Sequence, residues 1–438
     1  MVKRAYAYLF VIVGALAIFW MARVFARPPA AVRSTAAVAL ARDAGATPSQ
    51  GVPSSVNATI YLLGYEGSTR SVSSVAPYIT LAANPSIANQ AAIHAAGIPL
   101  YTYTDFMVEY GCATCSPMYA DVLSVAPSVI AKDASGANVL YGSKLPPAYQ
   151  MDPTVNKLFD LWYKDVTHGH VGHPDYCYAD DVPGPAYADR TKPNDLSAWP
   201  AAEAAGVSSH IGDCHGIIYN GLGGGQGIDS TNALYVIDHT TVSPVGALEE
   251  DCYGYQAGSN DAPIPLARWQ ATENDEIAMY DRHDLWLCYP DSYGPGAAEQ
   301  SLRTFIFASF MLTYDLAHST MFERFYANAT DKNNFIGPEY GLVATDPVVA
   351  EPSDINALGI GGAFGREYAH CYLRGVPVGP CASVVNPDSV AHPYPYGTKY
   401  AHSLVLTGGS VFDGGTAAFS STAIPDTLDP QTAVIVAQ

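Results

Sequence analysis

The chain has 438 residues, of which 49% are apolar, and a formal net charge of −20 at pH 7. So large an apolar fraction excludes a mainly disordered protein, and the negative charge argues against nucleic acid as a partner. The length suffices for one large domain with a sizeable core and a second, smaller domain.

The first 27 residues have the pattern of an export segment. Lys3 and Arg4 give a positive start, and residues 5–21 are almost wholly apolar. This segment is either a signal peptide, with Val24 and Ala26 as the small residues before the cut, or an uncleaved membrane anchor. Both alternatives place the rest of the chain outside the cytoplasm, and the second attaches it to a membrane. Residues 28–56, rich in Ala, Pro, Ser and Val, are expected to form a linker.

Cysteine usage agrees with export, because disulfides persist in oxidising compartments. The sequence holds eight cysteines, at positions 112, 115, 177, 214, 252, 288, 371 and 381. Cys371 and Cys381 are close enough along the chain to staple a hairpin, whereas the other pairings stay open. Cys112 and Cys115 have the spacing of a zinc or redox motif, but no second such pair occurs in the sequence.

From residue 57 onward, strand-like and helix-like segments alternate. Strands are predicted at 60–64, 78–82, 98–103, 176–179, 215–220, 245–250, 284–289 and 320–322. Helices are predicted at 86–96, 153–166, 195–205, 230–236, 263–280 and 300–314. This alternation is typical of a parallel α/β architecture, and a strand count close to eight favours a (β/α)8 TIM-like barrel over residues 57–350.

The remaining residues, 351–438, have a different pattern. Short apolar strands separated by Gly and Pro turns are predicted at 368–374, 382–385, 402–406 and 417–424. They predict a small C-terminal antiparallel β domain packed on the barrel.

Pairs of acidic residues end two of the predicted barrel strands. Asp180 and Asp181 follow the strand at 176–179, and Glu249 and Glu250 end the strand at 245–250. Barrel enzymes keep catalytic groups at the carboxyl ends of their strands, and two carboxyl groups are what hydrolysis of a glycosidic bond requires. Neighbouring side chains of a strand point to opposite faces, so only one acid of each pair should face the barrel mouth.

Other residues near predicted strand ends are candidates for contacting a substrate. Asp105 and Glu66 could hydrogen-bond sugar hydroxyls, although a surface or capping role is an equal alternative. Aromatic side chains could stack on a sugar ring or simply pack in the core. They are Tyr65, Tyr103, Tyr219, Tyr253 and Trp286.

Several of these segments resemble a group of TIM-barrel glycoside hydrolases distantly related to the endo-α-1,4-polygalactosaminidases. The segment 175–181 resembles the family's strand-four Asp-Gly-Val-Phe-Leu-Asp-Asn, 217–221 resembles its strand-five Asn-Gly segment, and 245–250 resembles its strand-six Asp-Gly-x-x-x-Glu. Near the end of the chain, 365–368 and 385–387 resemble its Arg-Glu-Phe and Val-x-Asn-Pro segments.

This resemblance extends over residues 57–433 and implies catalytic places for Asp180 and Glu250, with Asn220 at the substrate. Tyr176 stands where the family has Gly, and Val245 where it has Asp. Because of these departures, the choices between Asp180 and Asp181 and between Glu249 and Glu250 stay open.

The sequence thus predicts an exported glycoside hydrolase that cleaves a polysaccharide or oligosaccharide by carboxylate acid/base catalysis, without a metal or other cofactor. One alternative is a non-catalytic glycan-binding barrel at the cell surface. Another is a metal-dependent hydrolase or deacetylase that uses His168, His170 and His173, whose spacing can chelate a metal.

Overall fold

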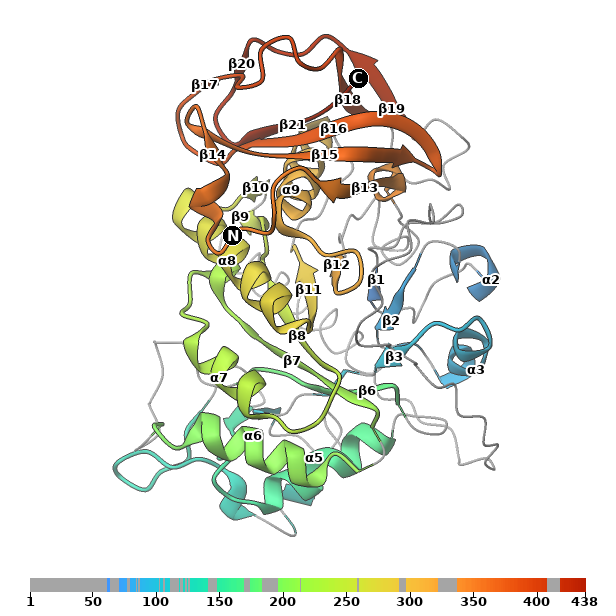
Figure 1. Ribbon diagram of the computed structural model, residues 1–438. Coiled ribbons are helices and arrows are strands. Elements are labelled where there is room, and N and C mark those ends of the chain that lie inside the picture. The colour runs from blue at the N-terminus through green and yellow to red at the C-terminus, as the bar shows by residue number, and fades with distance from the viewer. Residues whose placement is uncertain are drawn as a thin grey trace, which may run out of the picture.

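The computed structural model of the chain is shown in Figure 1. It describes residues 61–63, 71–76, 79–83, 85, 87–101, 103–104, 107–110, 118, 121–122, 124, 127–140, 148–168, 174–182, 196–212, 214–257, 260–290, 297–321, 337–407 and 418–438. The predicted export segment (1–27) and linker (28–56) lie outside these residues. Among the helices that are described, none combines the length and the apolar character needed to cross a bilayer.

The N-terminal part of the fold is built on an eight-stranded parallel sheet whose spatial order follows the chain order. Its strands are β1 (Tyr61–Leu63), β2 (Leu81–Ala83), β3 (Leu100–Tyr101), β6 (Tyr176–Ala179), β7 (Gly216–Leu222), β8 (Val245–Glu250), β11 (Leu285–Tyr289) and β12 (Ser319–Met321). All residues of β6 and β11 are buried, as expected of parallel strands covered on both faces. The predicted parallel α/β architecture is confirmed.

One edge strand of this sheet, β12, comes close to the start of β2, the neighbour of the other edge strand β1. Thr80, just before β2, has its Oγ1 atom 3.5 Å from that of Thr320 on β12. Within the described residues no hydrogen-bonded ladder joins β1 to β12, so the sheet is a parallel half-barrel. Its closure into a complete barrel stays a prediction.

Helices follow most of these strands and cover the sheet (Figure 1). They are α2 (Val72–Val75), α3 (Ile87–Ala95), α5 (Lys157–His168), α6 (Trp199–His210), α7 (Thr231–His239), α8 (Leu266–Arg282) and α9 (Ala297–Thr313). Helix α5 corresponds to the helix predicted at 153–166, and its apolar side chains Leu158, Leu161 and Trp162, which share one face, are all buried.

A second, antiparallel sheet forms the C-terminal part of the fold, drawn in orange and red in Figure 1. Its strands are β13 (Leu342–Pro347), β14 (Gly359–Ile360), β15 (Ala363–Leu373), β16 (Val376–Asn386), β18 (His402–Thr407), β19 (Ala418–Thr422) and β21 (Thr432–Ala437). The antiparallel character is as predicted. The sheet also includes β13, which precedes the predicted boundary at 350, and β21, which sequence analysis did not predict.

Two-stranded antiparallel pairs make up the rest of the strands in the described residues. They are β4 (Val108–Tyr110) with β5 (Ala148–Gln150), β9 (Gly254–Ala257) with β10 (Asn260–Pro263), and β17 (His392–Pro393) with β20 (Thr427–Leu428).

Helix α9 packs against both sheets and is fastened at its C-terminal end. The last carbonyl groups of a helix have no partner within it, and here side chains of the C-terminal sheet donate to them. Arg366 Nη1 donates to the Leu312 carbonyl (2.7 Å) and the Tyr368 hydroxyl donates to the Met311 carbonyl. Ser383 Oγ adds a bond to the Ala308 carbonyl (2.5 Å), which lies about one turn earlier in the helix. A cationic Arg366 also suits the negative end of the helix dipole.

Three disulfides lie within the described residues. Two of them join a strand of the parallel sheet to a residue beside the neighbouring strand. Cys177 on β6 is bonded to Cys214, just before β7, and Cys288 on β11 is bonded to Cys252, just after β8. Cys371–Cys381 joins β15 to β16, which confirms the predicted hairpin staple. Three disulfides are typical of an extracellular protein. Cys112 and Cys115 lie outside the described residues.

Buried carboxyl groups gather where α8 and α9 meet the C-terminal sheet. Thr313 Oγ1 lies 2.8 Å from one carboxyl oxygen of Glu273 and 2.8 Å from one of Glu276. A hydroxyl has a single proton to donate, so at least one of these acids must itself be protonated. Burial raises the pKa of Glu276 from about 4.5 to about 8, and that of nearby Glu351 to about 7.

This cluster predicts a protein that is more stable in mild acid than at alkaline pH. The folded state holds protons that the unfolded state releases above about pH 4.5, so stability is full below that pH and is lost as pH rises toward 8. We expect the free energy of unfolding to fall by about 1–3 kcal/mol between pH 5 and pH 8. Urea unfolding at each pH measures this loss, and Glu276→Gln should reduce it. A free energy that rises over the same interval would contradict the prediction.

Candidate functional site

Asp180 directly follows β6 and is 7% exposed. Three side chains donate hydrogen bonds to it. The Tyr103 hydroxyl lies 2.5 Å from Oδ2, while Asn220 Nδ2 and the Tyr178 hydroxyl lie 2.6 and 3.3 Å from Oδ1. Tyr178 and Asp180 are two residues apart, which is the spacing that places strand side chains on one face. Asp180 therefore points to the same side of the sheet as the tyrosines around it.

Asn220, on the neighbouring strand β7, connects Asp180 to Glu250. Its Nδ2 atom lies 2.6 Å from Asp180 Oδ1 and 3.1 Å from Glu250 Oε1, so one amide group donates to both carboxyl groups. Because both bonds meet at one nitrogen, the two acceptor oxygens lie within about 6 Å of each other. Two acids separated by 70 positions in the sequence thus share one donor, at the carboxyl ends of β6 and β8, the two strands that flank β7.

Glu249 and Glu250 point to opposite sides of β8, as the alternation of a strand requires. Glu249 is fully buried and accepts hydrogen bonds from the Gly225 amide (2.6 Å), Thr272 Oγ1 (2.7 Å) and Trp286 Nε1 (3.2 Å). Thr272 belongs to α8, so Glu249 faces the helices. Glu250 is half-buried and faces Asn220.

A glycine-rich turn, η3 (Gly224–Gln226), completes the surroundings of Glu250. Gln226 Nε2 donates to Glu250 Oε2 at 3.0 Å. The turn packs so closely on β8 that a Cβ atom at Gly225 would lie 2.6 Å from the Glu250 carbonyl oxygen. Glu249 therefore holds the backbone of the turn, and the turn holds Gln226 against Glu250.

Burial raises the pKa of Asp180, whereas the bonds from Tyr103 and Asn220 act in the opposite direction. Burial also raises the pKa of Glu249, and the charge of Asp275 adds to this effect. The same physical cause acts on Tyr101, the last residue of β3, whose pKa is raised first by burial and then by the charges of Asp180 and Glu250.

The structure places the other predicted site residues as follows. Tyr253 and Trp286 are buried in the core, where the Tyr253 hydroxyl donates to Glu276 and the Trp286 indole donates to Glu249, so neither ring is open to a sugar. Tyr219 turns toward Thr240, on the face of β7 opposite to Asn220. Asp181 follows Asp180 in a left-handed conformation, with φ 56°. Tyr65, Glu66 and Asp105 lie outside the described residues.

Sequence analysis missed Gln226, Tyr178 and Tyr101. A signal for Tyr178 was available, because Tyr176, Tyr178 and Asp180 occupy alternate positions and so share a face. Gln226 gave no such signal, since its contact with Glu250 depends on how the glycine turn folds back.

No group of three or more His, Cys, Asp or Glu side chains placed to hold a metal ion occurs in the part of the chain that the structure describes. The side chains of His168, His170 and His173 lie outside that part.

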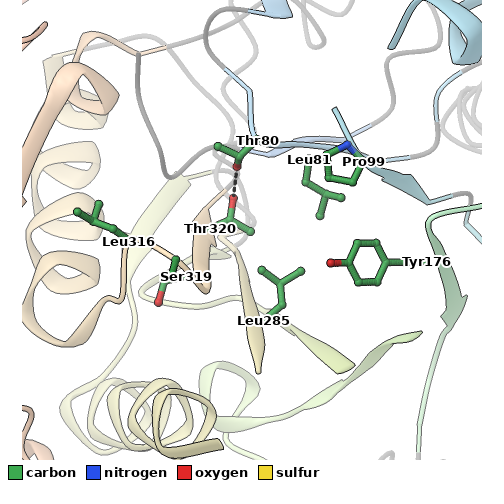
Figure 2. Close-up of a pocket in the computed structure, with 9 residues that line it drawn as sticks. Thr80, Leu81, Pro99, Tyr176, Leu285, Leu316, Ser319 and Thr320 are labelled. Carbon is green, nitrogen blue, oxygen red and sulfur yellow. Dashed lines mark hydrogen bonds between the residues drawn. The ribbon is translucent and has the colours of Figure 1, made fainter. Parts of the chain in front are cut away.

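A cavity of about 80 Å³ lies at the opposite end of the sheet (Figure 2). It is lined by the first residues of four strands, Leu81, Tyr176, Leu285 and Ser319, together with neighbouring residues. The cavity is therefore separate from Asp180 and Glu250, which lie at the carboxyl ends.

Comparison with known proteins gives no family assignment. No family model matches the chain, and no curated protein matches it. Solved structures that resemble it include the glycoside hydrolase domain of PelA from Pseudomonas aeruginosa, with 11% identity, a TM-score of 0.36, and coverage of 57% of this chain and 89% of that one.

Two further structures resemble the chain in the same way. The pullulanase from Bacillus acidopullulyticus has 11% identity and a TM-score of 0.35 over 79% of this chain and 47% of its own. A point mutant of trehalulose synthase MutB has 9% identity and a TM-score of 0.37 over 87% of this chain and 99% of its own. This chain thus spans about half of the pullulanase. Because these TM-scores are low, none of the three likenesses enters the argument for function.

Proposed function

We propose that this protein is an exported glycoside hydrolase that cleaves a polysaccharide or oligosaccharide with Asp180 and Glu250. The observation that carries the proposal is the Asn220 amide, which donates to both carboxyl groups and so holds them close together. Two carboxyl groups at the carboxyl ends of β6 and β8, on either side of β7, fit the chemistry of glycosidic bond cleavage. The proposal includes closure of the half-barrel into a (β/α)8 barrel, which the approach of Thr80 to Thr320 supports.

The surroundings of the two acids favour different roles. Asn220 donates to both acids and so does not distinguish them, whereas Gln226 donates to Glu250, and such a donor stabilises the ionised form. Asp180 is more deeply buried, which favours its neutral form, and the phenols of Tyr103 and Tyr178 can accept a hydrogen bond from a protonated Asp180 as well as donate one. We therefore assign Asp180 as the acid that protonates the leaving oxygen and Glu250 as the nucleophile.

The distance between the acids predicts the stereochemistry. A nucleophilic mechanism requires carboxyl groups about 5 Å apart, whereas a mechanism that places water between them requires a wider gap. The shared donor keeps the acceptor oxygens within about 6 Å, so we expect hydrolysis with retention of anomeric configuration. Proton NMR of the first product released from the preferred substrate measures this, and a first product of inverted configuration would refute the role of Glu250 as nucleophile.

Screening the purified protein against a panel of purified polysaccharides tests the proposal itself. Release of reducing ends by the wild-type protein, and not by Asp180→Asn, is the expected result. Retention of glycan binding without release of reducing ends from any polysaccharide would favour a non-catalytic glycan-binding barrel instead. Loss of activity on treatment with a chelator would favour a metal-dependent hydrolase.

A further inference from the structure

Tyr101 is part of a group of tyrosines on the face of the sheet that carries Asp180. It ends β3 and is 1% exposed. Its ring stacks on that of Tyr178, with centroids 4.8 Å apart and planes 6° from parallel. The ring of Tyr103 also packs on Tyr178, with a centroid distance of 5.6 Å. Tyr103 and Tyr178 both donate to Asp180.

The Tyr101 hydroxyl differs from these two because it is buried and has no hydrogen-bond partner among the described residues. A buried donor without a partner costs stability, and such groups are rare in native proteins. Phenylalanine would make the same stack without this cost. The hydroxyl therefore calls for an explanation other than packing.

The position of the Tyr101 hydroxyl supplies an explanation for why it is kept. The charges of Asp180 and Glu250 both raise its pKa, so it lies within electrostatic reach of both carboxyl groups. Tyr101 is paired in register with Tyr176, four residues before Asp180, which puts its backbone deeper in the sheet than the acids. The hydroxyl is thus a neutral donor at the floor of the site, and it stays protonated over the pH range in which such enzymes work.

We propose, on the basis of the function proposed above, that Tyr101 contacts the substrate by donating a hydrogen bond to an oxygen of the sugar unit held between Asp180 and Glu250. Sugar hydroxyl, ring and acyl oxygens are all acceptors that such a donor can bind. A bond formed away from water is stronger than an exposed one. A site with a buried donor also discriminates against an analogue that lacks the matching acceptor, so Tyr101 would contribute to specificity.

Tyr101→Phe tests this proposal, with Tyr219→Phe as the matched control. Tyr219 is equally buried on β7, but its hydroxyl bonds Thr240 on the opposite face of the sheet. The probe is the polysaccharide that the wild-type protein cleaves fastest in the panel. We expect Tyr101→Phe to lower kcat/KM by about 10²-fold, with an unchanged or higher Tm and an unchanged pH optimum. Tyr219→Phe should keep kcat/KM within about twofold of the wild-type value, whatever its effect on Tm.

The outcomes separate this inference from the proposed function. If the wild-type protein cleaves the polysaccharide and Tyr101→Phe is as active, the inference is wrong and the function stands. If the wild-type protein binds a polysaccharide of the panel without cleaving it, and Tyr101→Phe weakens that binding about tenfold while Tyr219→Phe does not, the hydrolase is refuted and the sugar contact stands. If the wild-type protein neither cleaves nor binds any of them, both are overturned.

Discussion

Glu250→Gln is expected to lower kcat by about 10⁴-fold, and Asp180→Asn by about 10³-fold, on the preferred polysaccharide. Glutamine in place of Glu250 keeps the size of the side chain but cannot attack the anomeric carbon. Asparagine in place of Asp180 cannot protonate the leaving oxygen. Both variants should fold, because Glu250 is only half-buried and the Gln226 amide and the Tyr103 hydroxyl can turn to present an oxygen to the new amide group. Steady-state kinetics and circular dichroism on the same preparations measure both effects.

The neighbouring acids provide the controls. Asp181→Asn should leave kcat within a few-fold of the wild-type value. Glu249→Gln should mainly lower the free energy of unfolding, because an amide cannot accept from the Gly225, Thr272 and Trp286 donors at both of its atoms. A loss of activity in Asp181→Asn as large as that in Asp180→Asn would mean that the wrong acid of the pair has been chosen.

The free energy of unfolding should also depend strongly on the ion pair between Arg303 and Glu339. Both side chains are 1% exposed, and Arg303 Nε donates to Glu339 Oε1 at 2.7 Å while Nη2 contacts Oε2. Removing one partner leaves the other charge buried and uncompensated. We expect Arg303→Met to lower the free energy of unfolding by about 3–5 kcal/mol, measured by urea unfolding.

A double variant distinguishes this cause from simple loss of packing. Arg303→Met combined with Glu339→Leu removes both charges and should recover most of the lost stability, since a well-packed apolar pair can replace a buried ion pair. Lys157→Ala, which breaks an exposed pair with Asp160, should cost less than about 1 kcal/mol. A double variant no more stable than Arg303→Met would show that the charges are not the reason.

The sequence predicted the order and type of the elements in the parallel part of the fold because its signals there are local. β6 was predicted at 176–179 and is found at Tyr176–Ala179, since a short apolar run between polar turns has few other interpretations. The C-terminal sheet was predicted less completely. β21 contains the β-branched run Val434-Ile435-Val436, a local strand signal that sequence analysis overlooked. Its pairing with β16 and β18, which are distant in sequence, could not be read from any local pattern.

The candidate site, too, could be predicted only in part from local sequence patterns. The sequence located the acids at strand ends but could not decide between Glu249 and Glu250, because the face of a residue depends on how far the strand continues. The structure shows that β8 extends through Glu250, which orients the two side chains oppositely. The contact of Gln226 with Glu250 was beyond sequence reasoning, since it requires the path of the glycine turn.

The contacts of α9 make the two sheets of this protein depend on each other. One side of α9 packs on the core of the parallel sheet through the contact of Phe310 with Trp286, while Arg366 and Tyr368 of the other sheet bond its final carbonyl groups and Ser383 bonds its Ala308 carbonyl. Cutting the polypeptide between the two sheets would remove the partners of a helix, so we expect the two halves to unfold as one cooperative unit. A gene fusion or deletion that treated the C-terminal half as a detachable accessory would damage the scaffold that aligns Asp180 with Glu250.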